Sequence, residues 1–330
     1  MYKISEHKKN ILLWCILIVS VAAIIIVVVK NETVNEKKQH IIYIPKTIDE
    51  NNDFWTQLIE GVHMAGVEKG LEVSVVSAKK EEDYEMQNEL ILWAIEQKPD
   101  AILLSPSNYT ETTPYAKKIK ENGIPLILID SAIDEEIADT MIATNNISLG
   151  EAQGSFMKQF VDEDSKIAII GHVKNSSTAI ERENGVRIGL EEDADRIVDV
   201  VFCDSDYDKA YQLLLSLLEK YPDINLVAGL NEYSAVGAAR AIKDQNLKGK
   251  IKVFGTDSSL EEIQLLEEGI FEGIIIQNPF KMGYMGVEAA VKILKGEEVP
   301  AFIDAGCELI TKDNLYTEEN QKLLFPFKEE

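Results

Sequence analysis

From Ile41 onward, short apolar runs alternate with longer stretches in which apolar residues recur at helical spacing. Short apolar runs bounded by turn residues are typical of buried strands, whereas apolar residues three and four positions apart indicate helices. The pattern predicts strands at 41–44, 73–76, 101–104, 125–129, 140–143, 166–170, 197–202, 226–229, 252–255 and 273–277. It predicts helices at 54–68, 83–97, 112–121, 149–161, 178–191, 209–220, 234–245, 260–268 and 281–295.

Strands that alternate with helices in this way predict parallel βαβ units, whose helices cover both faces of a sheet. The alternation begins again near residue 149, so we predict an α/β protein with two doubly wound, Rossmann-like lobes joined by a hinge. The chain is expected to cross between the lobes near Asn145 and Gln277. The predicted lobes comprise residues 41–145 with 278–306, and residues 146–277 with 307–330.

The N-terminal segment has a different character. Residues 11–29 form an apolar run without a formal charge, which is long enough to cross a bilayer as one helix. Lys3, Lys8 and Lys9 precede the run and favour an N-terminus, residues 1–10, that stays in the cytoplasm. We therefore predict a single-pass transmembrane anchor at 11–29 and a polar linker at 30–40. The remaining domain is expected to lie outside the cytoplasm at the cell membrane.

Two other interpretations fit this segment less well. A cleaved signal peptide has a weak candidate site after Ala22, but seven apolar residues follow it, from Ala23 to Val29. Lipid attachment at Cys15 is disfavoured because Trp14 stands where a small residue is expected. The length of the run and its flanking residues favour an uncleaved anchor over removal.

Composition narrows the range of partners. The 330-residue chain is 45% hydrophobic and 27% charged, which is ordinary for a folded protein, and its net charge is −24. A strongly acidic chain is a poor nucleic-acid partner, because phosphate binding needs clustered Lys and Arg. Besides Cys15, the chain has Cys203 and Cys307, and we expect both to be free and buried.

Polar and aromatic residues gather where the predicted strands end. Residues 51–55, Asn-Asn-Asp-Phe-Trp, follow the first strand and open its helix. In open α/β sheets ligands bind at the carboxyl ends of strands. Any one of these residues could instead cap a helix or anchor it to the core, but the whole set suits a neutral polyol. The other members of the set are Ser105, Asp130, Asn146, Arg182, Tyr207, Asn231, Asp257 and Gln277.

From about Ile41 to Gly306 these motifs resemble the ribose-binding branch of the periplasmic sugar-binding proteins. Residues 52–55 look like that family's Asn-Pro-Phe-Phe motif, and residues 177–185 are similar to its Ala-Arg-Glu-Arg-x-x-Gly segment. The resemblance implies the type I periplasmic binding protein fold and no enzymatic activity. The ligand-binding side chains that it implies are Asn52, Phe54, Trp55, Ser105, Asp130, Ser131, Arg182, Tyr207, Asn231, Asp257 and Gln277.

Two positions depart from the pattern of ribose binders. Ser105 stands where they usually carry Asn, and Ser131 stands where they usually carry Arg. Both replacements are shorter, so they are expected to enlarge the first-lobe side of the cleft and to remove one positive charge. A larger sugar or a modified polyol would then fit better than ribose.

Other kinds of chemistry find little support in the sequence. No Gly-rich fingerprint follows the first strand, where Pro45 and Lys46 stand, so we predict no dinucleotide site and no cofactor. Asp204, Asp206 and Asp208 have the spacing of calcium ligands, but the Gly and Glu that the loop requires are missing. His63 and His172 have no partner at metal-ligand spacing, and we expect both to be structural. We predict no metal site and no catalytic residues.

The predicted function is a membrane-anchored, extracytoplasmic binding protein that closes two lobes over a small-molecule sugar. Its expected partner is either an ABC permease or a sensor histidine kinase. The alternative is the core of a sugar-responsive transcriptional regulator of the LacI type, which shares the two-lobed architecture. The apolar N-terminus and the acidic charge disfavour that alternative.

Overall fold

The computed structural model describes residues 14, 17, 19–21 and 38–325. The chain divides into two compact units, Met1–Lys38 and Gln39–Glu330, and the second contains both sheets. The predicted cytoplasmic N-terminus (1–10), anchor (11–29) and linker (30–40) lie almost entirely outside the described residues. Within the described part of the chain, no helix has the length and apolar character needed to cross a membrane.

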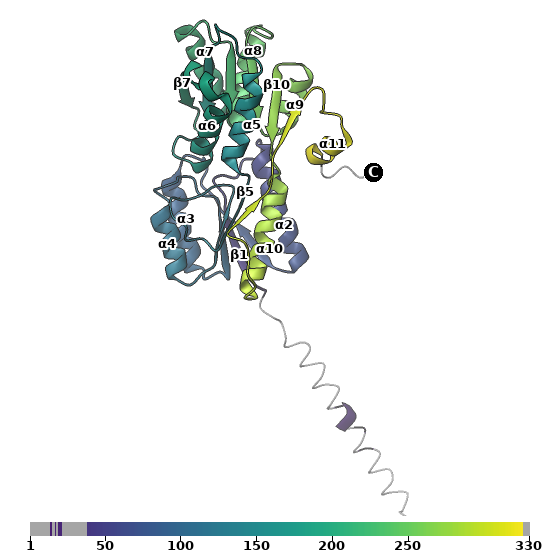
Figure 1. The fold of residues 1–330 in the computed structure, drawn as a ribbon. Helices are drawn as coiled ribbons and strands as arrows, with labels where there is room; N and C mark the ends of the chain where they lie inside the picture. Colours follow the sequence, from purple (N-terminus) through teal and green to yellow (C-terminus); the bar gives the residue numbers. More distant parts are fainter. Residues whose placement is uncertain (1–13, 15–16, 18, 22–37, 326–330) are drawn as a thin grey trace, which may run out of the picture. The chain divides into compact units, whose positions relative to one another are not determined.

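The second unit contains two six-stranded sheets (Figure 1). The first sheet has the order β11-β5-β4-β3-β1-β2, and the second has the equivalent order β12-β10-β9-β8-β6-β7. The first is built from β1 (His40–Ile44), β2 (Glu72–Val75), β3 (Ala101–Leu104), β4 (Leu126–Ile129), β5 (Thr140–Ala143) and β11 (Phe302–Asp304). The second is built from β6 (Ile167–Gly171), β7 (Ile197–Phe202), β8 (Leu226–Gly229), β9 (Lys252–Thr256), β10 (Phe271–Ile276) and β12 (Glu308–Thr311). The strands pair in parallel except β12, which is antiparallel to β10.

Helices cover both faces of each sheet. The helices of the first lobe are α2 (Asp53–Lys69), α3 (Tyr84–Glu96), α4 (Thr113–Glu121) and α10 (Pro279–Leu294). Those of the second lobe are α5 (Asn146–Lys158), α6 (Ser177–Leu190), η1 (Glu191–Arg196), α7 (Tyr207–Lys220), α8 (Glu232–Asp244), α9 (Leu260–Glu267) and α11 (Glu318–Leu324). Most begin at a side-chain cap; Asn52, for example, accepts a hydrogen bond from the Trp55 N–H at the start of α2.

The pleat of β1 shows why its apolar run is continuous. Ile41 and Tyr43 point into a core shared with α2 and α10, whereas Ile42 and Ile44 point into a core shared with α3 and α4. All of these side chains are fully buried. A strand buried on both faces needs apolar residues at every position, which is the pattern seen in the sequence.

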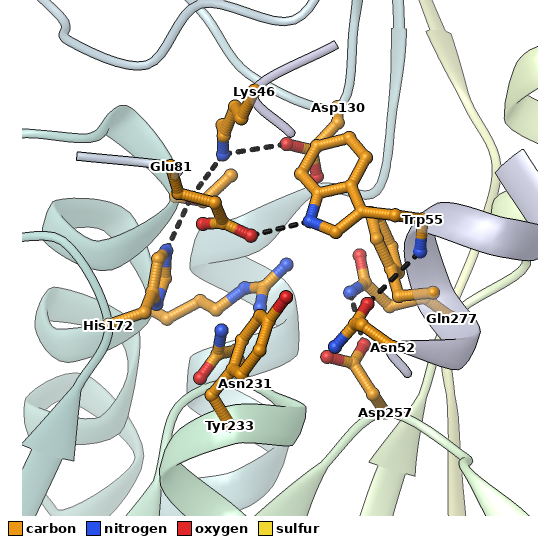
Figure 2. Close-up of a pocket in the computed structure, with 13 residues that line it drawn as sticks. Lys46, Asn52, Trp55, Glu81, Asp130, His172, Asn231, Tyr233, Asp257 and Gln277 are labelled. Carbon is orange, nitrogen blue, oxygen red and sulfur yellow. Dashed lines mark hydrogen bonds and ion pairs between the residues drawn. The ribbon is translucent and has the colours of Figure 1, made fainter. Parts of the chain in front are cut away.

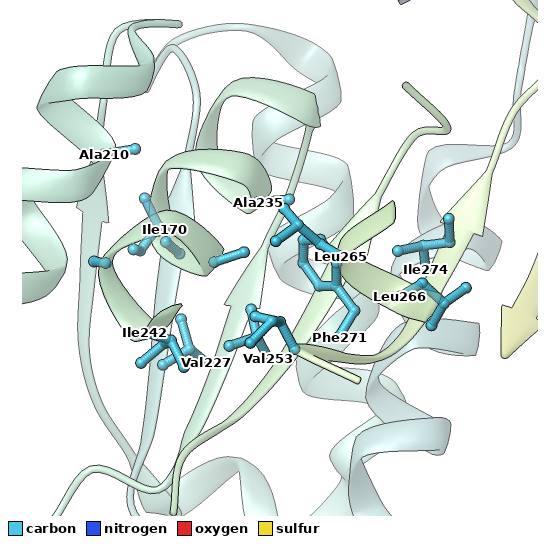
Figure 3. Close-up of a cluster of buried hydrophobic side chains, with 14 of the residues drawn as sticks. Ile170, Ala210, Val227, Ala235, Ile242, Val253, Leu265, Leu266, Phe271 and Ile274 are labelled. Carbon is cyan, nitrogen blue, oxygen red and sulfur yellow. The ribbon is translucent and has the colours of Figure 1, made fainter. Parts of the chain in front are cut away.

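The second lobe follows the same principle. One face of its sheet packs on α7, α8 and α9, and the buried side chains at this face come from β6, β8, β9, β10 and the helices (Figure 3). Phe271 and Ile242 lie in this cluster, and a smaller cluster around Phe254 fills the opposite face beneath α5 and α6. The two cores hold the strand ends at fixed positions.

The strands change sheet at three places, after β5, after β10 and between β11 and β12. At the third crossing Gly306 has φ of +83°, a left-handed conformation that favours glycine. The first two crossings coincide with those expected near Asn145 and Gln277. The division of the sheets is compatible with the predicted lobes, whose residue boundaries stay a prediction.

The predicted two-lobed α/β fold with parallel sheets is confirmed, and each predicted strand and helix is present with ends shifted by a few residues. Three elements near the C-terminus, β11, β12 and α11, were not predicted. β11 and β12 are only three and four residues long and are partly exposed, so their sequences lack a continuous apolar run.

Candidate functional site

A cavity lies between the two lobes, at the carboxyl ends of their parallel strands (Figure 2). The space that it leaves for the centres of water-sized molecules is only about 20 Å³. One water molecule needs roughly 10–15 Å³ on this measure, so the lobes must move apart to admit a larger molecule. Its walls are formed by Lys46, Asn52, Phe54, Trp55, Glu81, Asp130, His172, Thr178, Arg182, Asn231, Tyr233, Asp257 and Gln277.

The structure brings most of the predicted site residues together around this cavity. Those that line it are Asn52, Phe54, Trp55, Asp130, Arg182, Asn231, Asp257 and Gln277. They come from both lobes and from strand ends far apart in the sequence. That each contacts a ligand stays a prediction.

Three predicted residues do not line the cavity. Ser105 is fully buried and exchanges a 2.9 Å hydrogen bond with the Tyr43 hydroxyl beneath the cavity wall. Ser131 is also fully buried and donates a 2.5 Å hydrogen bond to Asp130. The ring of Tyr207 lies in a neighbouring outer pocket, where its hydroxyl donates to Glu232. Ser105 and Ser131 are too short to reach the cavity from the strand ends.

Aromatic residues form one wall. The rings of Phe54 and Trp55 meet edge to face, with their centroids 5.1 Å apart. The indole N–H of Trp55 donates to the Glu81 carboxylate, which also accepts a 2.7 Å hydrogen bond from Ser205 of the second lobe. Glu81 is buried, and that burial raises its pKa although Lys46 and these donors act in the opposite direction. The wall therefore combines apolar ring faces with a hydrogen-bonded carboxylate.

Asp130 is held by a lysine that the sequence interpretation did not include in the site. The Lys46 ammonium lies 2.8 Å from the Asp130 carboxylate, and both side chains are buried. Burial alone would raise the pKa of Asp130, but Lys46 and Arg182 outweigh it and leave the pKa lowered. Ser131 carries no charge, and Lys46 supplies a cation to this wall from just beyond β1.

Arg182 is positioned by the close packing of α5 against α6. A Cβ atom added at Gly150 of α5 would lie 2.2 Å from the Arg182 carbonyl oxygen, so the two helices approach too closely for a larger residue. This approach lets the Arg182 Nε donate to Asn146 at 2.8 Å, while its Nη1 donates to the Leu230 carbonyl at 2.8 Å. Two of its nitrogens are thereby fixed, and the guanidinium forms part of the cavity wall.

Asp257 closes the opposite wall. Its backbone has φ of +91°, as Asp130 has φ of +68°, so both aspartates sit in conformations that non-glycine residues seldom adopt. The Asp257 carboxylate accepts from the Gln277 amide at 2.7 Å and from the Glu232 backbone N–H at 2.9 Å. Burial raises the pKa of Asp257, while Arg182 and these two donors act in the opposite direction.

His172 was expected to be structural, yet it lines the cavity. It follows β6 directly, just as Lys46 lies close after β1, so the two occupy corresponding places in the two lobes. In both sheets the chain order reverses beside this first strand, which is where doubly wound folds form a crevice. The polar residues just after these two strands, Lys46 and His172, could therefore have been assigned to the cavity from the sequence. Glu81, Thr178 and Tyr233 carried no comparable signal, because they lie in a loop and in first helical turns.

Contacts between the lobes surround the cavity. The Tyr233 hydroxyl donates to Asp49 at 2.8 Å, and the Ala132 N–H donates to the Ser177 hydroxyl at 2.8 Å. Further interlobe hydrogen bonds join Ser205 to Glu81, Leu260 to Asp53, Phe54 to Glu232 and Tyr109 to Asn175. Both lobes thus meet around the space.

Among the described residues, Cys203 and Cys307 do not form a reactive centre. Cys203 and Cys307 are both free; Cys203 is buried as expected, whereas Cys307 is only half-buried. Burial raises the pKa of Cys203 to about 12, so its thiol stays protonated. In the part of the chain that the structure describes, no group of three or more His, Cys, Asp or Glu residues is arranged to hold a metal ion.

The protein-family model described as the periplasmic binding protein domain matches residues 41–298, which is most of the chain. The chain belongs to the periplasmic binding protein family. The resemblance inferred from the strand-end motifs is thereby confirmed, and the match spans both lobes of this periplasmic binding protein.

Relatives of this periplasmic binding protein include characterised and solved proteins. The ribose import binding protein RbsB of Bacillus subtilis strain 168 is 27% identical over 263 residues, covering 79% of this chain and 84% of that protein. A crystal structure of a sugar transporter from Clostridium phytofermentans is 50% identical with a TM-score of 0.80, covering 84% of this chain and all (100%) of that one. A carbohydrate transporter solute-binding protein from Agrobacterium radiobacter, in complex with D-arabinose, is 26% identical with a TM-score of 0.83, covering 88% and 100%.

Proposed function

We propose that this protein binds a neutral monosaccharide in the interlobe cavity and presents it to an ABC-type import system. The observation that carries the proposal is the cavity itself, where fixed carboxylates, amides and an arginine from both lobes surround a small space flanked by aromatic rings. The relatives support the choice of ligand class, since their descriptions name ribose import and bound D-arabinose. Family membership further implies an extracytoplasmic domain.

The electrostatics of the cavity favour a neutral ligand. The cation of Lys46 is matched by Asp130, and the charge of Arg182 faces both Asp130 and Asp257. A ligand with many hydroxyl groups can donate to the carboxylates and accept from Arg182 and the amides. The Phe54 and Trp55 rings would cover the apolar C–H faces of a sugar ring.

Hinge closure is the proposed mechanism. The interlobe hydrogen bonds of Tyr233 and Ser177 can form only when the lobes meet, so they contribute to the closed state. Separation would occur at the three crossings, where Gly306 supplies backbone freedom. A sugar that bridges Asp130 and Asp257 would stabilise closure, because it would bind groups on both lobes at once.

The test is calorimetric titration of the full-length protein with D-ribose, D-arabinose, D-allose and D-galactose. We expect at least one sugar to bind, and Arg182→Ala to weaken that binding thirtyfold or more, because loss of Arg182 strands buried polar partners at a cost of about 2–5 kcal/mol. The matched control is Arg187→Ala on the same helix, whose side chain pairs with Glu183 at a partly exposed position. Sugar binding that survives in the Arg182 variant would contradict the cavity assignment.

The membrane anchor and the signalling partner are separate proposals. The apolar run at 11–29 would tether the domain beside its membrane partner, and we rank an ABC permease first because the relatives are import proteins. A sensor histidine kinase is the rival partner. Sugar uptake and sugar-induced transcription, measured in a deletion strain, separate the two. Lost uptake with intact induction supports the permease, whereas normal uptake with lost induction supports the kinase.

A further inference from the structure

The side chain of His172 is buried at one end of the cavity, with only 2% of its surface exposed. One ring nitrogen, Nε2, lies 2.8 Å from the Thr178 hydroxyl and 3.1 Å from the Ser176 hydroxyl. The other nitrogen, Nδ1, is buried and has no hydrogen-bond partner among the described residues. Nearly all buried polar atoms in proteins find a partner, so this nitrogen requires an explanation. Because His172 lines the cavity, the missing partner can be a ligand.

The hydrogen bonds of Nε2 restrict what that partner can be. Ser176 donates its own proton to the Val173 carbonyl at 2.9 Å, and Thr178 can either donate to Nε2 or accept from it. Nδ1 is therefore an acceptor in one tautomer of the ring and an N–H donor in the other. A hydroxyl group satisfies both tautomers because it can donate and accept. A carboxylate satisfies only one tautomer, and a C–H group satisfies neither.

The far end of the cavity has a similar unpartnered atom. In Figure 2 the labelled side chain of Gln277 lies across the cavity from His172. The Gln277 Nε2 donates to Asp257 at 2.7 Å, which fixes the amide orientation, and its Oε1 is buried with no partner in the described part of the chain. An amide oxygen only accepts, so a group that donates must come from the ligand. A molecule with hydroxyls at both ends answers both requirements.

We propose that His172 is a specificity-determining ligand contact, whose Nδ1 binds one hydroxyl group of the sugar. The protein then selects sugars that carry a hydroxyl at that position over analogues that lack it. The inference rests on the proposed function and deepens it, because it specifies one hydroxyl group of the sugar that the site recognises.

The surroundings of the imidazole agree with a neutral hydrogen-bonding role. Burial lowers the pKa of His172 well below its usual value, and the nearby charges of Arg182 and Lys46 lower it further. The ring therefore stays uncharged, and its tautomer can adjust to the ligand. A carboxylate ligand is disfavoured at this cavity because Glu81, Asp130 and Asp257 already line it.

The experiment pairs changes in the ligand with changes in the protein. The full-length protein is titrated with whichever of D-ribose, D-arabinose, D-allose and D-galactose binds most tightly, and with the monodeoxy analogues of that sugar. We expect one analogue to bind wild type at least tenfold more weakly because it lacks the hydroxyl read by His172. That loss should shrink below threefold in His172→Phe, whose ring cannot form the hydrogen bond. The exposed histidine variant His63→Ala is the control and should keep the full loss.

If His172→Phe fails to fold, a second measurement on the wild-type protein tests the proposal. In wild-type protein labelled with ¹⁵N-histidine, the Nδ1 resonance of His172 should shift with the parent sugar and shift less with that one analogue. The assignment of His172 would be overturned if each analogue lost the same affinity in the variant as in wild type. It would also be overturned if the corresponding uronic acid bound more tightly than the parent sugar. If wild type binds none of the four sugars, the proposed function itself fails, and this inference fails with it.

Discussion

The buried ion pair between Lys46 and Asp130 gives the sharpest prediction for stability. The two charges are 2.8 Å apart, and their side chains are only 3% and 4% exposed. Replacing Lys46 with Met keeps the length and bulk of the side chain but leaves Asp130 as a buried carboxylate without its principal cation. Breaking a buried pair by removing one partner typically costs about 3–5 kcal/mol. We therefore expect Lys46→Met to destabilise the protein by this amount.

The size of the effect follows from the chain length. Each kcal/mol shifts the midpoint of thermal unfolding by roughly 2–4 °C for chains of about 150–250 residues, so the midpoint should fall on the order of 10 °C. The measurement is unfolding of the full-length protein by heat and by guanidinium at pH 7, without sugar. Lys117→Met is the matched control, because Lys117 pairs with Glu135 at a site where both side chains are 44% exposed. Such an exposed pair contributes less than about 1 kcal/mol.

A double variant separates the ion pair from simple loss of packing. Lys46→Met combined with Asp130→Asn removes both charges, so we expect it to be more stable than Lys46→Met alone. The dependence of stability on pH below 7 gives a further test of the ion pair. Because the folded-state pKa of Asp130 lies below its ordinary 3.8, its stabilising effect is present above that pH and is lost as the pH falls through the folded value. A Lys46→Met variant within about 1 kcal/mol of wild type, with a double variant no more stable than the single one, would refute the reasoning.

Three further predictions concern binding, pH and location. Asp257→Ala should weaken sugar binding thirtyfold or more, since Gln277 and a backbone N–H lose their acceptor; the control is the exposed Asp223→Ala, and calorimetry decides. Burial raises the pKa of Glu232 from 4.5 to about 8, so the stability of the fold should decline as the pH rises between those values. In thermal melts at pH 5 and pH 8, Glu232→Gln should reduce this decline, and an unchanged decline would contradict the prediction. The full-length chain should remain in the membrane fraction after high-salt washing, and a soluble form that begins near Ala23 would contradict the anchor.

The fold was predictable because its signal repeats. Buried strands such as residues 101–104 and 126–129 are continuous apolar runs, and most helices carry apolar residues at helical spacing. The elements that escaped prediction are short and partly exposed. β11 and β12 are defined by where the hinge places them beside β5 and β10, which is a long-range relation that no local pattern encodes.

The site was predictable only in part. Strand-end residues such as Asp130, Asp257 and Gln277 reach the cavity because every strand of a parallel sheet ends at the same edge. Side-chain reach explains the differences. Ser105 and Ser131 lie at strand ends but are fully buried and do not line the cavity, whereas the longer Lys46 side chain lines it and reaches Asp130.

The contacts between the lobes could not be predicted from the sequence. Glu81 enters the cavity wall because Trp55 and Ser205 hold it from opposite lobes. His172 looked structural because no metal-ligand partner stood at the right spacing, and its unpartnered nitrogen became visible only in three dimensions.

The central claim is that a sugar binds between the two lobes, and a crystal structure of the protein with its tightest-binding sugar tests it most directly. We expect one sugar in the interlobe cavity, with its hydroxyls within hydrogen-bond distance of Arg182, Asp257 and Gln277 and its ring against Phe54 or Trp55. A sugar bound elsewhere on the molecule, with the interlobe cavity holding only water, would contradict it.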